Sequence, residues 1–533
     1  MAAPQKIELL DTTLRDGAQA ESISFSINDK LEIAEALDAL GVALVEAGNP
    51  GSNPKDLEFF DVVRKLNLKQ AAVVAFGATC RPGTEPGDDP RLASLLRAGT
   101  KTVCVFGKAW KFHVAEVLHT TDDENLRMIA ATIKWLVDAG RRVIFDAEHF
   151  FNGYVDDPAY AMKVAETAAS AGASVVCLCE TNGGMFPEDV SCATAAVVAH
   201  LGGRCAVGIH AHDDGGLAVA NTLAAVRAGA THVQGTIAGF GERCGNANLA
   251  TVIGDLQLKL GYGCIGDEHI RQLTPTVRRV AAIANVTLPG GLPYVGRRAF
   301  AHKGGMHMDG VRKAARSFEH VAPESVGNSR RFLISEMAGK SAVIDRIGAV
   351  LPGLEPDASG VELVLARLKE LEKAGYQFEG ADGSFEILIR RILSPYKPFF
   401  ELERFRLVSE LSVGASKGRN TTAMIKISSA GREEITAAEG NGPVNALDGA
   451  LRKALEKFYP RLGEMKLTDY KVRVFDTGAA TASMVRVLIE STDGGRIWNT
   501  VGVSSDIIEA SWIALLDSVE IKLIHDELEK TGK

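Results

Sequence analysis

The segment AVGIHAHDDGGLAVANTLAAVRAGATHVQGTI, residues 206–237, decides the fold of this chain. Two short apolar runs, AVGIHAH and HVQGTI, flank a helical stretch, which is the pattern of a parallel strand–helix–strand unit. The first 260 residues repeat this alternation from end to end. The predicted strands are residues 6–11, 43–48, 71–76, 102–107, 142–148, 174–181, 206–212 and 232–237.

Eight strand–helix units are the number that closes a (β/α)8 TIM barrel. An open doubly wound sheet would alternate in the same way, but its Gly-x-Gly-x-x-Gly fingerprint is absent after the first strand. We therefore predict an α/β fold with a TIM barrel at its centre. Gly41, Gly140 and Gly172 stand where the intervening helices should end.

The pattern changes after about residue 268. Helical stretches at 268–285 and 340–375 flank an irregular segment, and the chain is β-rich from about residue 400. Residues 422–455 and 483–519 form a weak internal repeat of alternating strands, a glycine-rich turn and an amphipathic helix. We predict a catalytic barrel over 1–268, a helical linker and lid region over 269–395, and a C-terminal α+β regulatory and dimerising domain over 396–533.

Composition excludes several classes of protein. The 533 residues are 46% hydrophobic and 24% charged, which is typical of a globular chain, and the net charge of −8 argues against nucleic acid or anionic membrane as a partner. No apolar run reaches the 18 or so residues of a membrane span, and the start carries no signal-peptide pattern. Eight cysteines without a Cys-x-x-Cys pair are typical of reduced thiols, so we expect a cytoplasmic protein.

Polar side chains gather where the predicted strands end, and in a barrel these ends converge on the catalytic face. The sharpest feature is His210 with His212, because two residues apart on a strand both imidazoles face one side, about 6–7 Å apart at Cα. Asp16 follows the first strand and Asn246 follows the eighth. This mixed nitrogen and oxygen set predicts a site for a divalent ion, with Zn²⁺, Mn²⁺ and Mg²⁺ as candidates.

Charged and aromatic residues surround that set. Arg15 precedes Asp16 and is a candidate for holding a carboxylate or a developing alkoxide, with an ion pair across the barrel mouth as its alternative role. Glu148 ends the fifth strand and is a candidate general base, with a surface ion pair as its alternative. Phe76 and Phe106 end the third and fourth strands, where they either limit a pocket or simply pack.

The glycine-rich segment FAHKGGMHMDG, residues 300–310, carries His302 and His307. Two histidines in such a segment could form a second metal site or belong to a lid that carries an acid–base group. We favour the lid, because closure over the barrel mouth would shield a reactive enolate from water.

Several long segments resemble one family. DTTLRDGAQAE (11–21), the stretch from His210 to Leu249, and AFAHKGGMHMDGV (299–311) resemble the signatures of the isopropylmalate, homocitrate and citramalate synthases and their lyase relatives. The resemblance covers nearly the whole chain. The segments nearest to the citramalate type are PGSNPKD (50–56), VFGKAWKFHV (105–114), DAEHFFNGY (146–154), CETNGG (179–184) and VGNSRRFLISEMAGKS (326–341).

The resemblance implies a role for each matching residue. It implies that Asp16, His210 and His212 bind the metal, with Asn246 as a fourth contact. The other roles it implies are substrate binding for Arg15, Gln19 and Thr181, and proton transfer for Glu148 with His302 or His307.

The implied reaction is a metal-dependent condensation of acetyl-CoA with pyruvate to (R)-citramalate and CoA, in isoleucine biosynthesis. The resemblance also implies a homodimer and feedback inhibition by isoleucine, with leucine as the alternative. Acceptance of 2-oxoisovalerate, as in an isopropylmalate synthase, and homocitrate synthesis stay open. Ala47, Asn49 and Glu180 depart from the family pattern near the pocket, which leaves the 2-oxo acid less certain than the reaction.

Three further readings are weaker. A carbon–carbon lyase would generally lack the long C-terminal segment, residues 400–533. An amino-acid sensor with a degenerate barrel would have lost the Arg15–Asp16–Gln19 and His210–His212 sets. A Schiff-base aldolase would need a buried lysine, and none of the predicted strand ends carries one.

Overall fold

The computed structural model describes residues 4–332, 340–354, 357–410, 420–429, 431–475, 483–494 and 496–531. The chain forms two compact units. The first comprises Met1–Ala301 with Glu319–Arg331, and the second comprises His302–Phe318 with Phe332–Lys533. Residues 333–339 of the VGNSRRFLISEMAGKS segment lie outside the described residues.

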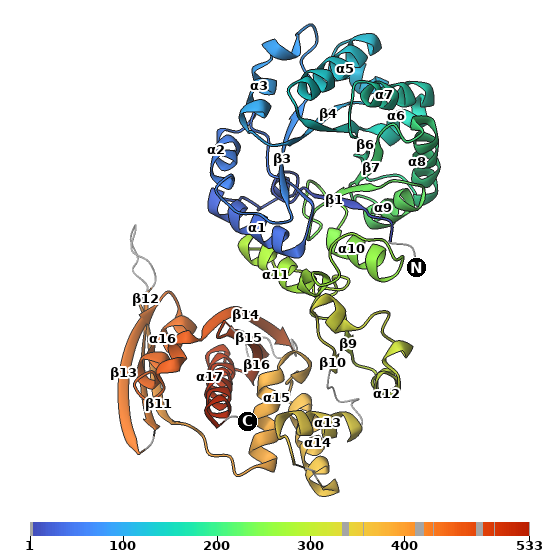
Figure 1. The fold of residues 1–533 in the computed structure, drawn as a ribbon. Helices are drawn as coiled ribbons and strands as arrows, with labels where there is room; N and C mark the ends of the chain where they lie inside the picture. Colours follow the sequence, from blue (N-terminus) through green and yellow to red (C-terminus); the bar gives the residue numbers. More distant parts are fainter. Residues whose placement is uncertain are drawn as a thin grey trace. The chain divides into compact units, whose positions relative to one another are not determined.

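The first unit is built on a closed parallel barrel in which each strand pairs with the next and β8 pairs with β1 (Figure 1). This confirms the predicted TIM barrel. The strands are β1 (Glu8–Asp11), β2 (Leu44–Glu46), β3 (Ala72–Ala78), β4 (Thr102–Lys108), β5 (Arg142–Glu148), β6 (Val175–Glu180), β7 (Ala206–Ala211) and β8 (His232–Gly235).

Helices surround the strands, as Figure 1 shows. They are α1 (Ile27–Leu40), α2 (Pro54–Val63), α3 (Pro90–Arg97), α4 (Lys111–Glu116), α5 (Asp122–Asp138), α6 (Phe150–Asp156), α7 (Pro158–Ser170), α8 (Pro187–Leu201), α9 (Ala218–Arg227) and α10 (Leu249–Leu258). Local chemistry sets their ends. Ser26 and Asp29 form a capping box at the start of α1, and Gly41 ends it with a φ of 88° that glycine adopts without strain.

The barrel interior begins with an apolar layer. Leu10, Leu44, Val74, Cys104, Ile144 and Val175 pack together inside the strands, separate from the larger core between strands and helices. Parallel strands buried on both faces require this double packing. The apolar layer leaves the carboxyl ends of the strands free for polar side chains.

The segment after the barrel contains α11 (Leu273–Ile283), which agrees with the helix expected over 268–285. Short strands β9 (Ala301–His302) and β10 (Arg331–Phe332) fall where the chain passes between the two units. The helices of the second unit before its sheets are α12 (Gly305–Lys313), α13 (Lys340–Val350), α14 (Ala358–Lys373) and α15 (Asp382–Leu393).

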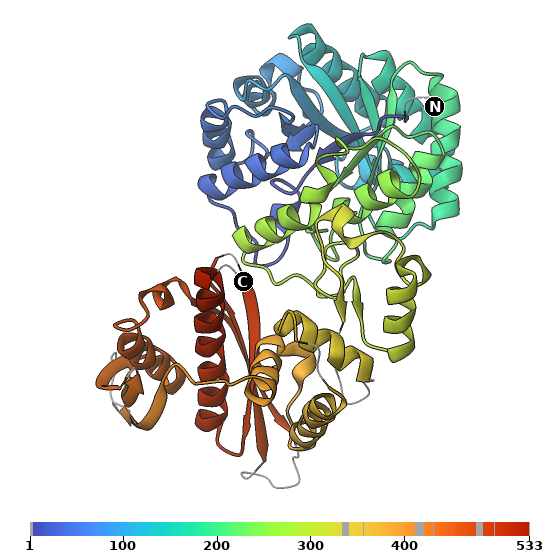
Figure 2. The same ribbon diagram turned by 60° about the horizontal axis from the view of Figure 1, so that its bottom comes forward.

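Two βββα modules complete the second unit (Figures 1 and 2). The first has β11 (Glu401–Glu410), β12 (Asn420–Ser429), β13 (Arg432–Gly440) and α16 (Pro443–Leu455); the second has β14 (Lys466–Phe475), β15 (Met484–Thr492), β16 (Ile497–Ser504) and α17 (Ile507–Thr531). Each antiparallel sheet therefore has one strand more than the predicted repeat. Residues of both modules share one core, as the sequence repeat predicted. In the described residues, no helix is long and apolar enough to cross a membrane.

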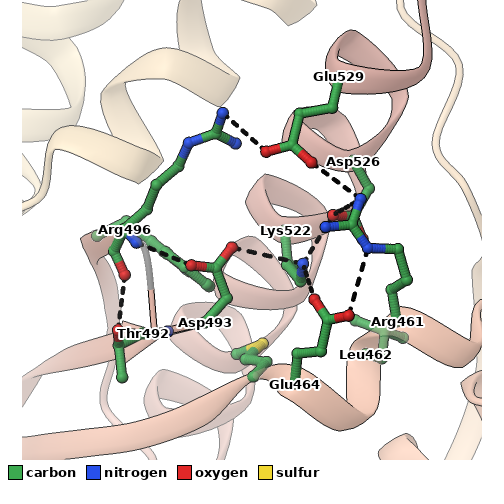
Figure 3. Close-up of polar contacts among 12 residues, drawn as sticks. Arg461, Leu462, Glu464, Thr492, Asp493, Arg496, Lys522, Asp526 and Glu529 are labelled. Carbon is green, nitrogen blue, oxygen red and sulfur yellow. Dashed lines mark hydrogen bonds and ion pairs between the residues drawn. The ribbon is translucent and has the colours of Figure 1, made fainter.

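A polar network joins the two modules, and its centre is the fully buried side chain of Lys522 on α17 (Figure 3). The Lys522 ammonium lies 2.7 Å from Asp526, 3.1 Å from Glu464 and 3.4 Å from Asp493. Glu464 follows the helix of the first module, whereas Asp493 and Asp526 belong to the second. One cation therefore ties three separate segments together.

We predict that Lys522→Met destabilises the second unit by about 3 kcal/mol, because it leaves buried carboxylates without their cation. This is the low end for a broken buried pair, since Arg461 stays 3.2 Å from Asp526. The exposed Lys457, paired with Glu434, provides the control, and Lys457→Met should change stability by less than about 1 kcal/mol. Denaturant unfolding of the full chain measures both, and equal shifts would contradict the prediction.

Candidate functional site

The His-x-His pair lies where β7 leaves the barrel. His210 and His212 are both buried, and their Nε2 atoms lie 3.3 Å apart. The Asp16 carboxylate, from the turn after β1, places Oδ2 3.3 Å from His210 Nε2. Residues almost 200 positions apart in the chain thus meet at one point, as the sequence predicted.

These separations fit one bound ion. Two ligand atoms that are each about 2.1 Å from a metal lie roughly 3.0–3.4 Å apart when the angle between them is ~90–110°. Two unprotonated Nε2 atoms facing each other repel unless a cation or proton lies between them. Burial lowers the pKa of His210 to about 3, so this imidazole is neutral and can act as a ligand.

Two other clusters of candidate ligands lie deeper in the barrel, within the described residues. One comprises Glu46, Cys104 and Asp146, and the other comprises Asp146, Cys177 and Cys179. Burial raises the pKa of the Cys104 and Cys177 thiols well above the usual value. A protonated thiol is a poor ligand, so the Asp16–His210–His212 cluster fits a metal best.

Asp16 is held as an anion. Burial opposes its charge, but the Arg15 guanidinium, helped by the Asn246 hydrogen bond, lowers its pKa to about 2. Asn246 Nδ2 donates a 2.6 Å hydrogen bond to Asp16 Oδ2. The Asn246 Oδ1 atom is buried without a hydrogen-bond partner among the described residues, so half a turn of this amide would offer the oxygen to an ion.

Arg15 is fixed from three sides. Its Nε donates to Glu46 Oε1 at 2.6 Å, its Nη1 lies 3.6 Å from Asp16, and its guanidinium carbon lies 3.8 Å from the centre of the Phe76 ring. The Phe76 and Phe106 rings stack with centroids 5.4 Å apart. A fixed guanidinium beside the metal ligands is suited to bind the carboxylate of a substrate.

These groups line a cavity of about 330 Å³ at the carboxyl ends of the strands. The cavity brings together every predicted site residue of the barrel except Asn246, and adds residues that were not assigned a role. Its lining is Arg15, Asp16, Gln19, Asn49, Phe76, Phe106, Asp146, Glu148, Cys179, Thr181, His210, His212, Glu242 and Arg243.

Glu148 has a partner that sequence reasoning missed. Lys108, the last residue of β4, forms an ion pair with Glu148, and its side chain is only 12% exposed. Lys108 is therefore a half-buried lysine at a strand end. The predicted fourth strand stopped at residue 107, one position short of Lys108.

Thr181 is positioned by the backbone around it. Its Oγ1 accepts a hydrogen bond from the His149 N–H, which leaves the hydroxyl proton free to face the cavity. Arg243 donates to the Thr181 carbonyl and also pairs with Asp214, which closes this side of the rim. Glu180, one of the departures from the family pattern, does not line the cavity; its carboxylate accepts from the Gly184 N–H instead.

His302 and His307 belong to the second unit. The His307 ring stacks on Phe318 with centroids 4.3 Å apart, and the His302 ring lies 6.1 Å from that of Phe332. Neither belongs to a cluster of three potential ligands in the part of the chain that the structure describes. A second metal site is thus not supported there, and the lid role stays a prediction.

Gln234 is the other residue that sequence reasoning missed. It is fully buried on β8 and pairs in register with His210. Its side chain forms one hydrogen bond with His210 on β7 and another with Asp146 on β5. The signal was available, since residue 234 lies inside a predicted strand of apolar character where glutamine is unusual.

Three family models match the chain in succession. The HMGL-like model matches residues 6–273, the homocitrate synthase post-HMGL domain-like model matches residues 294–375, and the LeuA allosteric (dimerisation) domain matches residues 379–523.

Individual proteins match over nearly the full length. An (R)-citramalate synthase of Aquifex aeolicus (strain VF5) is 48% identical over 530 residues, covering 98% of this chain and 99% of that protein. A probable 2-isopropylmalate synthase of Methanopyrus kandleri (strain AV19) is 31% identical, covering 97% of this chain and 98% of that protein. Among solved structures, a hydroxymethylglutaryl-CoA lyase from Pseudomonas aeruginosa has a TM-score of 0.46 at 21% identity, covering 56% of this chain and 97% of that one.

We predict that Asp16→Asn and His210→Ala each weaken the binding of Zn²⁺ or Mn²⁺ by more than ~100-fold, because loss of even an outer partner of a ligand costs 10–100-fold. Titration calorimetry of the metal-stripped protein measures the affinity. The exposed His200 on α8 supplies the control, and His200→Ala should bind as the wild type does. Tight binding by all three variants would place the metal elsewhere.

Proposed function

This chain belongs to the HMGL-like family and, within it, to the (R)-citramalate synthases, and on that premise we propose that it condenses acetyl-CoA with pyruvate to give (R)-citramalate and CoA. The observation that carries the proposal is the meeting of Asp16, His210 and His212 around one ion-sized point, beside a fixed Arg15. The product would enter isoleucine biosynthesis. The eight free cysteines favour a cytoplasmic enzyme.

Different residues of the cavity would bind the metal and the substrate. Asp16, His210 and His212, with Asn246 after its amide turns, would hold a Zn²⁺, Mn²⁺ or Mg²⁺ ion, which supplies Lewis acidity to a bound 2-oxo acid. Arg15 would hold the carboxylate of pyruvate and balance the alkoxide that forms at its ketone carbon. Gln19 and the Thr181 hydroxyl would donate to the same carboxylate.

Proton transfer needs a group for each direction. Glu148 would accept a methyl proton of acetyl-CoA, and Lys108 is its ion-pair partner. The resulting enolate attacks the ketone carbon of pyruvate, and a lid histidine, His302 or His307, would protonate the new alkoxide. Water then hydrolyses the thioester, which releases CoA as a thiol and leaves the second carboxylate of citramalate.

The outer parts of the chain would serve regulation. We propose the barrel over 1–268 as the catalytic domain, 269–395 as linker and lid, and 396–533 as the regulatory domain, on the basis of the match to an allosteric dimerisation domain. That match supports a homodimer. Isoleucine is the feedback ligand we propose, with leucine as the alternative.

Release of CoA, followed with a thiol reagent, tests the reaction. With pyruvate we expect the largest kcat/KM, and lower values with 2-oxoisovalerate, 2-oxobutyrate and 2-oxoglutarate; added isoleucine should lower the rate. Arg15→Lys should reduce kcat by roughly 10²–10³-fold, as the loss of an oxyanion donor does. A preference for 2-oxoisovalerate or 2-oxoglutarate would favour the isopropylmalate or homocitrate alternative.

The size of the acyl acceptor should depend on Phe106. We predict that Phe106→Leu raises kcat/KM for 2-oxoisovalerate relative to pyruvate by about 10-fold or more, because one or two methyl groups in an apolar pocket are worth ~1–3 kcal/mol. Phe76 is less suitable for this test because it also supports Arg15. The exposed Phe112 serves as control, and an unchanged ratio in Phe106→Leu would remove this ring from the specificity pocket.

A further inference from the structure

We propose that Asp146 and Gln234 are positioning residues that decide which nitrogen of His210 faces the metal site. The proposal rests on the proposed function only in needing an ion at Asp16, His210 and His212. It goes beyond that function in naming residues that would neither bind the ion nor touch the reacting atoms.

The three side chains form one chain of hydrogen bonds across the barrel interior. Asp146 on β5 accepts from Gln234 Nε2 at 2.7 Å, and Gln234 Oε1 lies 3.1 Å from His210 Nδ1. Asp146, Gln234 and His210 are respectively 4%, 0% and 6% exposed, so bulk water does not compete for these contacts. The barrel fixes the spacing, because Gln234 pairs with His210 in register across β7 and β8.

The direction of each hydrogen bond follows from the chemistry of the groups. The amide of Gln234 turns its N–H₂ end toward Asp146 Oδ1, to which it donates. Its carbonyl end then faces His210 Nδ1 and can only accept. A neutral imidazole carries one N–H, which is therefore on Nδ1.

The consequence appears on the other side of the ring. With the proton on Nδ1, the lone pair of His210 is on Nε2, which lies 3.3 Å from both Asp16 Oδ2 and His212 Nε2. The opposite tautomer would place an N–H at the metal site and prevent ligation. Asp146 thus acts on the metal through two intermediates, the amide of Gln234 and the ring of His210.

His212 provides an internal comparison. Its Nδ1 atom is buried and has no hydrogen-bond partner among the described residues. Of the two imidazoles, only His210 therefore has its tautomer set by the surrounding fold. His210 is therefore the preorganised ligand, and replacement of Gln234 should lower the affinity for the ion.

A matched pair of variants tests the proposal. Gln234→Met keeps the length and volume of the side chain but removes the acceptor, so the affinity for Co²⁺ or Zn²⁺ should fall by roughly 10–100-fold. Gln234→Glu keeps an oxygen that can accept from His210 Nδ1. A single proton shared between the new carboxyl group and Asp146 takes the place of the amide N–H. Its affinity should stay within about 3-fold of the wild type, and that of Asp146→Asn should fall between the two.

Three readouts separate positioning from a merely structural role. Metal affinity is measured by titrating the metal-free full chain. ¹⁵N spectra of histidine-labelled, metal-free protein report the tautomer of His210, which should be Nδ1-protonated in the wild type and in Gln234→Glu but mixed in Gln234→Met. With saturating metal, kcat of Gln234→Met should return to within about 3-fold of the wild type, whereas the metal concentration for half activation rises.

The outcomes are distinguishable. If the wild type binds metal and Gln234→Met binds it equally tightly, or if Gln234→Glu loses as much as Gln234→Met, the positioning role is overturned. If the wild type binds metal and the variants behave as expected but no citramalate forms, the proposed reaction fails and the positioning role stands. If His210→Ala binds metal as the wild type does, both the metal site and the positioning role are overturned.

Discussion

The constraint on which the site depends is the approach of two neutral, buried imidazoles to 3.3 Å between their Nε2 atoms. Such a pair cannot be relieved by moving apart, because His210 belongs to β7 and is paired on both sides by neighbouring strands. Without metal, an N–H on His212 Nε2 can fill this gap by donating to His210 Nε2, and a bound cation replaces that proton. The fold therefore builds an affinity for positive charge before any substrate arrives.

The layer below the imidazoles is equally constrained. Arg15 brings a positive charge into the barrel, and the carboxylates of Glu46 and Asp16 compensate it. Burial and the nearby Glu46 raise the pKa of Asp146 to about 7, so a further full negative charge is resisted there. With one guanidinium against two carboxylates, the interior carries a net negative charge without the ion. A divalent ion would add its charge where the substrate carboxylate and the developing alkoxide can balance it. Electrostatic preorganisation of this kind is usually the largest contribution to catalysis.

Sequence patterns predicted the fold and the meeting of Asp16, His210 and His212, for a common physical reason. Buried parallel strands require continuous apolar runs, so all eight strands were visible, and the alternation of side chains along a strand placed His210 and His212 together. What sequence reasoning missed are residues whose importance arises between strands. Gln234 matters because β8 lies in register beside β7, and Lys108 matters because β4 extends one residue further than its apolar run. The departure at Glu180 was overinterpreted, because alternation turns that carboxylate toward the Gly184 backbone and away from the cavity.

Regulation requires that the second unit responds as one body. Met308 of α12 packs into the same core as residues of α13, α14, α15 and β16, so α12 and the second βββα module share one apolar cluster. Ser384 on α15 strengthens this link, because it donates to Asp517 on α17 and accepts from the Val501 N–H on β16. A ligand shifts the equilibrium between two arrangements of such an assembly only by the difference between its binding free energies for the two, which is typically 1–3 kcal/mol. Because these contacts are buried and directional, α17, β16 and α15 are linked through one hydroxyl group, that of Ser384. Helix α15 also contributes to the core that contains Met308 of α12, so the same contacts connect α17 with α12.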